Sequence, residues 1–257
     1  MVPRRLNRLL ALLILFVWRD LRIQYAQTSL SVLWAFLQPI IAGFVFTWLF
    51  SEWVPIQGGK VPYLLFILPG MGSWFYFTHL IYQGGMVFSQ NQHLIRKIYF
   101  PRLILPLSKS ILALLDLIAA IMIALVMKII FHSPFEWKLL LLPIFIMTLG
   151  ITGFTFALWI ATLGFRYRDI FHFFPFILGL SVWLTPVFYP TTMLPAEFSW
   201  IHFFNPVAAS MDGMRWCLIP RYPLPWRYIF SFILILILFI FGIAYYKSVE
   251  PDMADSI

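Results

Sequence analysis

Long apolar runs, each bounded by charged residues or by Pro and Gly, follow one another along most of the chain. A helix rises 1.5 Å per residue, so about 20 apolar residues are needed to cross the hydrocarbon core of a bilayer. Such a run must be helical, because an isolated segment in lipid has to satisfy its own backbone hydrogen bonds. The pattern predicts six transmembrane helices, at residues 33–50, 63–88, 103–131, 139–165, 170–189 and 228–246.

The first thirty residues differ from these runs. Arg4, Arg5 and Arg8 precede a short apolar stretch, 9–18, which ends at Arg19 and Asp20 rather than at the small residues of a signal-peptide cleavage site. The stretch is too short to cross a bilayer. An apolar face with cations at both ends is typical of a helix that lies at the headgroup level. We expect such an interfacial amphipathic helix; a short buried helix is the alternative.

The longest segment without a transmembrane run, 190–225, holds two short semi-apolar pieces, 198–204 and 207–218. Asn205 and Pro206 separate the pieces, and neither is long enough to cross. A re-entrant hairpin fits this pattern, provided that protein or water shelters its backbone. The alternative is a loop that lies flat on the lipid.

The fold class predicted is therefore an all-α polytopic membrane protein with one transmembrane domain over residues 1–257. Its parts are the interfacial helix (1–30), transmembrane helices one to five (31–189), the extracytoplasmic hairpin (190–226), helix six (227–247) and a tail (248–257).

Composition supports a membrane protein. Of the 257 residues 62% are hydrophobic, 19% are aromatic and only 11% are charged, whereas a soluble domain carries about a quarter charged residues. A single cysteine and five scattered histidines do not form a disulfide or a zinc motif. The net charge of +8 could indicate a nucleic-acid-binding protein, but the basic residues are dispersed among apolar runs rather than gathered on one polar face.

Membrane topology explains these basic residues better. With both termini in the cytoplasm, most of them lie on the cytoplasmic side, as the positive-inside rule requires. The residues left on the opposite side are Lys60, Lys128, Lys138, Arg215, Arg221 and Arg227.

Motifs of enzymes are missing from the sequence. The only Gly-Lys pair, Gly59-Lys60, is followed by Val61, so there is no phosphate-binding loop, and no serine elbow or catalytic carboxylate pair occurs. We therefore expect no enzymatic activity, no cofactor and no metal in this chain. The same absence disfavours a membrane-embedded lipid or glycan transferase.

Two short basic loops are candidates for partner contacts. In the first, Leu94, Ile95 and Tyr99 recur at helical spacing opposite Arg96 and Lys97, which predicts an amphipathic helix over 91–100 beginning at Asn91. The second loop holds Arg166, Arg168 and Asp169. The alternative for both loops is that their basic residues only mark the cytoplasmic side.

Two mixed stripes are candidates for a channel wall. Trp34, Gln38 and Trp48 share one face of the first predicted helix. Ser181, Thr185 and Phe188 form a similar stripe on the fifth and lead to Tyr189. Aromatic faces stack on sugar rings, although Trp and Tyr near helix ends more often anchor a helix at the interface.

Asp116 lies about mid-bilayer in the third predicted helix, where an unpaired charge costs several kcal/mol. It must be paired, protonated or in contact with water; Lys109, two turns away, is a candidate for a shared network. We favour an interhelical hydrogen bond. The alternative is proton coupling in a secondary transporter of a small amphiphile.

A series of motifs resembles a known family. In order these are YAQTSLSVLWAFLQP (25–39), LIRKIYFPRLILP (94–106), RYRDI (166–170), LTPVFYP (184–190) and Asn205-Pro206. The series covers about residues 20–216 and is similar to that of ABC transporter type-2 permeases that export lipid-linked polysaccharides such as O-antigen, capsule and teichoic acid. Ser31 departs from the pattern, because many members have Gly there.

The resemblance implies an assembly and a place for it. Two copies of the permease would form a channel in the bacterial inner membrane, and two separate nucleotide-binding subunits would hydrolyse ATP with Mg²⁺ beneath it. Residues 91–100 would be the main coupling helix, with added contacts from the N-terminal helix and from 166–169. The segment 190–215, with Pro190, Asn205 and Pro206, would form the extracytoplasmic gate. Membrane lipids and the lipid-linked glycan would be the other partners.

Overall fold

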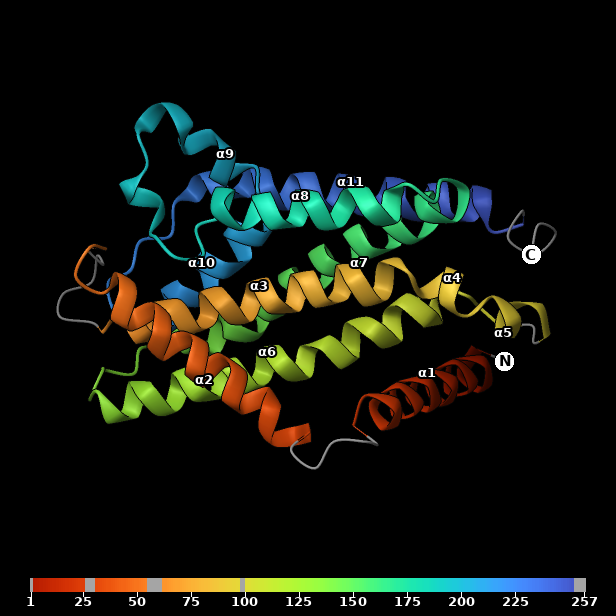
Figure 1. Cartoon of the computed structure of the whole chain (residues 1–257), viewed down its shortest axis with the longest axis horizontal. Helices are drawn as coiled ribbons and strands as arrows, with labels where there is room; N and C mark the ends of the chain where they lie inside the picture. Colours follow the sequence, from red (N-terminus) through yellow and green to blue (C-terminus); the bar gives the residue numbers. More distant parts are fainter. Residues whose placement is uncertain (1, 26–30, 55–61, 98–99, 252–257) are drawn as a thin grey trace.

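The regular structure is helical throughout residues 2–25, 31–54, 62–97 and 100–251, the ranges that the computed structural model describes. The all-α class is thereby confirmed; α3, α6, α8 and α11 run roughly along the long axis, and α2 crosses this direction at an angle (Figure 1). The long elements are α1 (Val2–Tyr25), α2 (Ser31–Phe50), α3 (Tyr63–Gly85), α6 (Ile104–Ile130), α7 (Leu142–Arg166), α8 (Ile170–Leu184), α10 (Pro206–Leu218) and α11 (Ile229–Val249). The short elements are α4 (Val87–Gln90), α5 (Gln92–Lys97), α9 (Ser199–Phe203), η1 (Trp137–Leu141), η2 (Thr191–Met193), η3 (Ala196–Phe198) and η4 (Trp226–Tyr228).

Four helices in these ranges are long and apolar enough to cross a membrane, judged by length and composition: Tyr63–Gly85, Ile104–Ile130, Trp137–Arg166 and Trp226–Val249. They correspond to the predicted transmembrane helices two, three, four and six. The apolar parts of the remaining two, Phe36–Phe50 and Ile170–Leu184, are shorter.

The fifth predicted helix ends earlier than the hydrophobic run suggests. It ends at Leu184 instead of Tyr189, because Thr185 adopts an extended backbone with φ −97° and ψ 137°. Thr185 precedes Pro186, and a residue before proline is forced out of the helical region. The chain from Thr185 to Pro190 is therefore non-helical.

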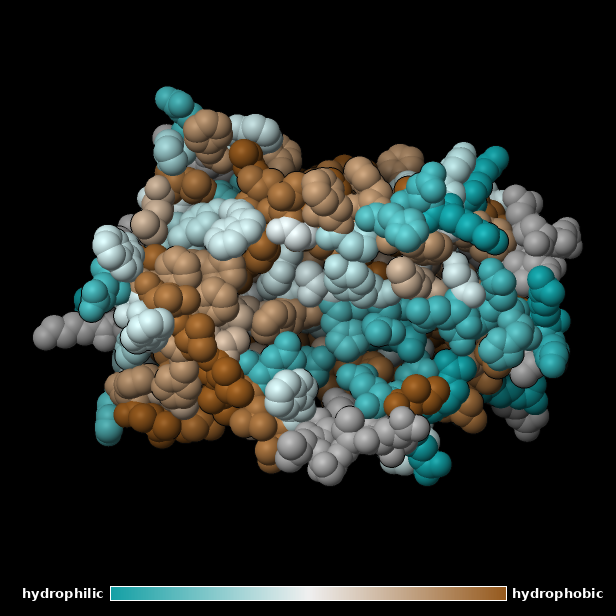
Figure 2. Space-filling view, viewed as in Figure 1, coloured by the Kyte–Doolittle hydropathy of each residue, from teal (hydrophilic) through white to brown (hydrophobic). Residues whose placement is uncertain are grey.

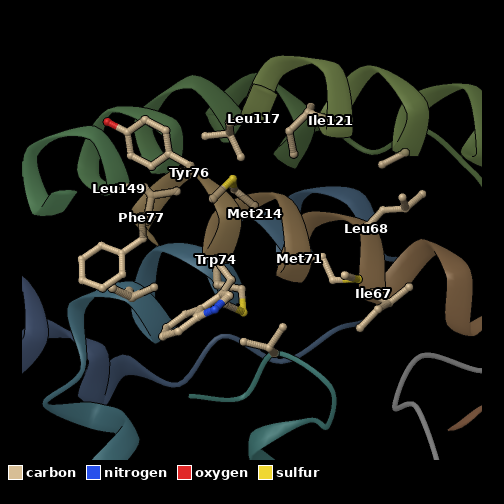
Figure 3. Close-up of a cluster of buried hydrophobic side chains, with 14 of the residues drawn as sticks. Ile67, Leu68, Met71, Trp74, Tyr76, Phe77, Leu117, Ile121, Leu149 and Met214 are labelled. Carbon is tan, nitrogen blue, oxygen red and sulfur yellow. The ribbon is translucent and has the colours of Figure 1, made fainter. Parts of the chain in front are cut away.

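Helix α3 forms the centre of the bundle, packing most extensively against α6 and α7. Its apolar stretch is 83% buried, compared with 22% for the stretch that contains α11. A Cβ atom added to Gly72 would lie 2.6 Å from Cβ of Ala120, so the missing side chain lets α3 and α6 approach closely. In Figure 3 Leu117 and Ile121 of α6 face the α3 side chains across this contact.

Helix α1 is fixed to the bundle through a buried carboxylate. Asp20 is 3% exposed and lies 3.0 Å from the ammonium of Lys109 on α6 and 2.7 Å from the guanidinium of Arg19. Lys109 therefore pairs with α1 instead of joining Asp116. Phe16 also faces the bundle, and the opposite face of α1 exposes Leu10, Ile14, Leu15 and Trp18.

The surface is divided along the long axis of the molecule. Figure 2 shows that the half toward α4 and α5 is mainly hydrophilic and that the half around α2 is mainly hydrophobic. Large apolar side chains also cover the outer faces of α6, α8 and α11, among them Ile129, Phe176 and Phe241, each more than 60% exposed. Apolar exposure on this scale is characteristic of a surface in contact with lipid or with another subunit.

Candidate functional site

The break at Asn205 and Pro206 is a helix cap that also ties two segments together. The Asn205 Oδ1 atom accepts hydrogen bonds from the backbone N–H groups of Val207 (3.0 Å) and Ala208 (3.3 Å), the first free donors of α10. Its Nδ2 atom donates to Thr185 Oγ1 at 3.1 Å. Two residues that the sequence assigned to a channel wall and a gate are therefore in direct contact.

Arg215 holds the non-helical segment after α8 in place. Its side chain is completely buried, with Nη1 donating to the carbonyl of Pro186 (2.6 Å) and Nη2 to that of Val187 (2.7 Å). Its Nε donates to the carbonyl of Phe66 on α3 at 3.2 Å, and its guanidinium carbon lies 3.7 Å from the centre of the Phe66 ring. Buried non-helical backbone needs such partners, because its carbonyl groups are shielded from water.

Asp212 balances the charge of Arg215, and its carboxylate accepts several hydrogen bonds. Arg215 Nη1 donates to its Oδ1 at 3.0 Å, as does the hydroxyl of Tyr222 at 3.1 Å. The hydroxyl of Tyr228 donates to Oδ2 at 2.6 Å. Burial and the nearby Asp212 charge raise the pKa of Tyr222 well above its usual value, so Tyr222 stays a neutral donor.

Sequence reasoning missed this network. It counted Arg215 as a loop cation outside the membrane and gave no role to Asp212. A signal was present, because an Asp and an Arg three residues apart in an apolar stretch lie on one helix face and pair when buried.

The two basic loops meet at the end of the bundle that holds α4 and α5. An open cleft of about 740 Å³ is lined by Arg96 from the first loop and by Arg166 and Arg168 from the second. Gln92 and His172 line it as well, and none of its described lining residues is acidic. The cleft therefore presents positive charge from two loops that are about 70 residues apart in the sequence.

The first loop is divided rather than continuous. Its helix α5 ends at Lys97, and the Asn91 side chain donates from Nδ2 to the carbonyl of Val87 at 2.8 Å, joining α4 to α5. Ile95 is buried and Leu94 packs beside it, whereas Arg96, Lys97 and, in the second loop, Asp169 are exposed. Tyr99 lies outside the described residues.

The predicted channel residues have different environments. Trp34 and Trp48 are 55% and 81% exposed on α2, whereas Ser181 and Tyr189 are half-buried. Thr185 and Phe188 are buried within the chain, Thr185 on Asn205 and Phe188 against the rings of Phe46 and Trp183. The break in the helix after Leu184 removes both from the expected stripe. Pro190, predicted at the gate, is also buried.

Gln38 lines a second, smaller cavity of about 240 Å³ between α2, α3 and α6. Asp116 lines the same cavity, and its Oδ2 lies 3.3 Å from Nδ1 of His79 on α3. Asp116 therefore has an interhelical partner, as expected, but the partner is His79.

Comparisons with known proteins agree with this architecture. The chain is similar to an O-antigen export system permease protein RfbA from Klebsiella pneumoniae, at 27% identity over 215 residues that cover 82% of this chain and 81% of that protein. A protein of the same name from Myxococcus xanthus is 28% identical over 216 residues, 82% of each chain. A family model described as ABC-2 type transporter matches residues 11–219, most of the chain. The chain therefore belongs to the ABC-2 type transporter family.

Proposed function

We propose that this chain is the transmembrane permease subunit of an ATP-driven exporter that moves a lipid-linked polysaccharide across the bacterial inner membrane. The observation that carries the proposal is the similarity to O-antigen export permeases over 82% of the chain. Family membership supports a membrane-embedded subunit that is not itself catalytic. In this proposal two copies of the chain form the channel, and two separate ATPase subunits bind ATP and Mg²⁺.

The cytoplasmic cleft is the proposed coupling site. Arg96, Arg166 and Arg168 converge there, so a carboxylate-bearing surface of an ATPase subunit has three guanidinium groups to pair with. Ile95 and Leu94 pack in a cluster with Leu158 and Ala161 of α7, which lets a push on the exposed end of α5 reach α7. Asn91 and Asp169 are proposed to extend the same contact surface, and Tyr99, outside the described residues, is retained as a predicted contact with the ATPase subunit.

With this cleft on the cytoplasmic side, the proposal also assigns a place to the other helices. Six helices cross the membrane with both termini in the cytoplasm, α2 and α8 being the two shorter ones. Helix α1 lies at the cytoplasmic interface, where its exposed apolar face contacts lipid. Helices α9 and α10 form a re-entrant extracytoplasmic gate hinged at Asn205 and Pro206. The exposed Trp34 and Trp48, with Gln38 and Ser181, contact the glycan.

The alternative, a proton-coupled secondary transporter built around Asp116, has less support. The His79 contact gives Asp116 a structural partner, and family membership points to an ATPase partner rather than to a proton gradient. Dissipating the proton gradient at constant ATP would stop export only under the alternative.

Deletion of the chain in its native host tests the proposal. Surface polysaccharide, followed by immunoblot, should disappear and its lipid-linked precursor should accumulate inside, and a plasmid copy should restore export. The purified chain alone should not turn over ATP, because it lacks a phosphate-binding loop, whereas a complex purified with its ATPase should. Unchanged surface polysaccharide in the deletion strain would rule the proposal out.

A further inference from the structure

The cavity between α2, α3 and α6 is lined largely by polar or ionisable side chains, namely Gln38, Thr78, His79, Tyr82, Gln83 and Asp116. Of the 23 residues of α3, 18 are buried. The others are Phe75, Thr78, His79, Tyr82 and Gln83, and all of them line this cavity. The spacing of these residues places them on one face of α3, and that face lines the cavity.

Gln38 and Asp116 complete the wall from the two neighbouring helices. Polar and ionisable residues inside the membrane face a water-filled space or a partner, and they mark substrate pathways. At about 240 Å³ the cavity has room for on the order of eight waters, given a share of about 30 Å³ each in the liquid. The cavity is therefore large enough for one small hydrated group.

The His79–Asp116 pair differs from the other ion pair between helices in the part of the chain that the structure describes. The side chains of Lys109 on α6 and Asp20 on α1 are 15% and 2% exposed, which suits a purely structural pair. Asp116 and His79 keep 30% and 27% exposure although they lie between helices. Among the described His, Lys and Arg side chains only that of His79 comes within 4.0 Å of Asp116, so the carboxylate can still accept hydrogen bonds from a ligand.

The chemistry of the wall selects a class of ligand. A phosphate group needs several cations, and a metal ion needs several carboxylates; this wall has one carboxylate and one imidazole. The amides of Gln38 and Gln83 each supply donors and an acceptor, and Asp116 supplies acceptors, which together suit neighbouring hydroxyl groups. The rings of Phe75 and Tyr82 offer apolar faces to the carbon face of a sugar.

We propose that this cavity is a subsite that binds the hydroxyl groups of one sugar unit of the transported glycan. The inference rests on the proposed function, and it assigns Gln38, His79 and Asp116 to direct or water-mediated contact with the substrate. A conveyor for a long polymer needs contacts that are weak enough to release. A small, hydrated and half-open cavity meets this need.

Export rates of variants in the native host test the subsite. Asp116→Asn should lower the rate of surface polysaccharide appearance about tenfold, the effect of losing one charge-assisted hydrogen bond. Gln38→Leu should lower it about threefold without changing the amount of inserted protein or its thermal unfolding midpoint, because Gln38 is exposed. Thr47→Val is the matched control, since it removes a hydroxyl of the same helix outside the cavity and should export at the wild-type rate.

A second measurement reports binding without export. In a Cys217→Ala background, Thr78→Cys in nanodiscs should react with a small water-soluble thiol reagent. Delipidated polysaccharide from the host should slow this reaction at least threefold, and the same polysaccharide should not protect when Asp116→Asn is also present. No reaction at position 78, or no protection, would overturn the inference.

The failure of the subsite is distinguishable from the failure of the proposed function. If deletion of the chain leaves surface polysaccharide unchanged, the chain is not the exporter. If deletion abolishes it while Asp116→Asn and Gln38→Leu export at the wild-type rate, the chain is the exporter and the cavity is not a subsite.

Discussion

Asp212 and Arg215 lie one turn apart on α10, with 3.0 Å between Oδ1 and Nη1, and neither side chain is exposed at all. The pair connects α10 to the segment after α8 and to α3 through carbonyl contacts of the guanidinium group. Hydroxyl donors from Tyr222 and Tyr228 bring the chain beyond α10 to the same carboxylate. One charged pair therefore holds together segments that are about 160 residues apart in the sequence.

Replacing Arg215 should destabilise the whole end of the bundle that holds α9 and α10. Arg215→Gln leaves Asp212 buried without a cation and leaves the carbonyls of Pro186 and Val187 without donors, at a cost of about 3–5 kcal/mol. Thermal unfolding in detergent, read by fluorescence-detected size exclusion, measures the loss. Arg221→Gln changes an exposed arginine nearby and is the control; equal midpoints for the two variants would disprove the role of the network.

Asn205 should act both as a cap and as a tether to Thr185. Asn205→Ala removes both functions, the cap alone being worth about 1 kcal/mol. Asn205→Asp keeps an acceptor for Val207 and Ala208 but loses the Nδ2 donor, so its unfolding midpoint should lie between those of Asn205→Ala and the wild type. If Asn205→Asp is as unstable as Asn205→Ala, the contact with Thr185 rather than the cap dominates.

The ion pair between Asp20 and Lys109 should keep α1 on the bundle. Asp20→Ala leaves Lys109, largely buried, without its counter-ion, and α1 should become more accessible. Limited proteolysis after Arg19 and Arg22 should therefore speed up several-fold in nanodiscs, whereas Asp169→Ala, which removes an exposed acid, should have no effect. If the wild type and Asp20→Ala are cleaved at equal rates, apolar contacts such as that of Phe16 are enough to hold α1 on the bundle.

Reversing both Arg96 and Lys97 to Glu should uncouple the ATPase, because carboxylates would then face the carboxylates expected on the partner. Export and stimulated ATP hydrolysis should fall at least tenfold while insertion stays normal. A control needs an exposed basic residue at the opposite end of the bundle. Lys128 does not qualify, because it is 1% exposed and its Nζ donates to the carbonyl of Leu218 at 2.8 Å, so that reversing its charge would disturb the fold. The exposed Arg221 and Arg227, both changed to Glu, are the matched pair; full coupling in the Arg96 and Lys97 variant would show that these residues only mark topology.

Stability should decrease in mild acid because of His202. Burial lowers the pKa of His202 below its usual 6.5, an effect that outweighs the opposing charge of Asp212. The unfolded chain then binds more protons, so stability is lost as the pH falls through about 6.5. The unfolding midpoint should drop between about pH 7.5 and pH 5.5, and His202→Gln should reduce the drop. If the unfolding midpoint of His202→Gln drops as far as that of the wild type, the loss of stability in acid comes from other groups than His202.

Much of the helical architecture was readable from the sequence. The apolar runs located α3, α6, α7 and α11 to within a few residues, because the length of a lipid-crossing helix and its need to satisfy its own backbone are local requirements. The break at Asn205 and Pro206 was readable for the same reason, since a cap and a proline act within one turn. The motif series indicated the family, and the family comparison confirms it.

The contacts between distant elements were decided only by the tertiary structure. Periodicity placed Thr185 and Phe188 on a stripe, but Pro186 ended the helix and the two side chains packed inward. Lys109 and Asp116 share a helix face, yet each found its partner on a different helix, Asp20 and His79. A buried charge takes the counter-charge that packing brings within a few ångströms, and packing depends on which helices are neighbours. Local pattern carries no information about that choice.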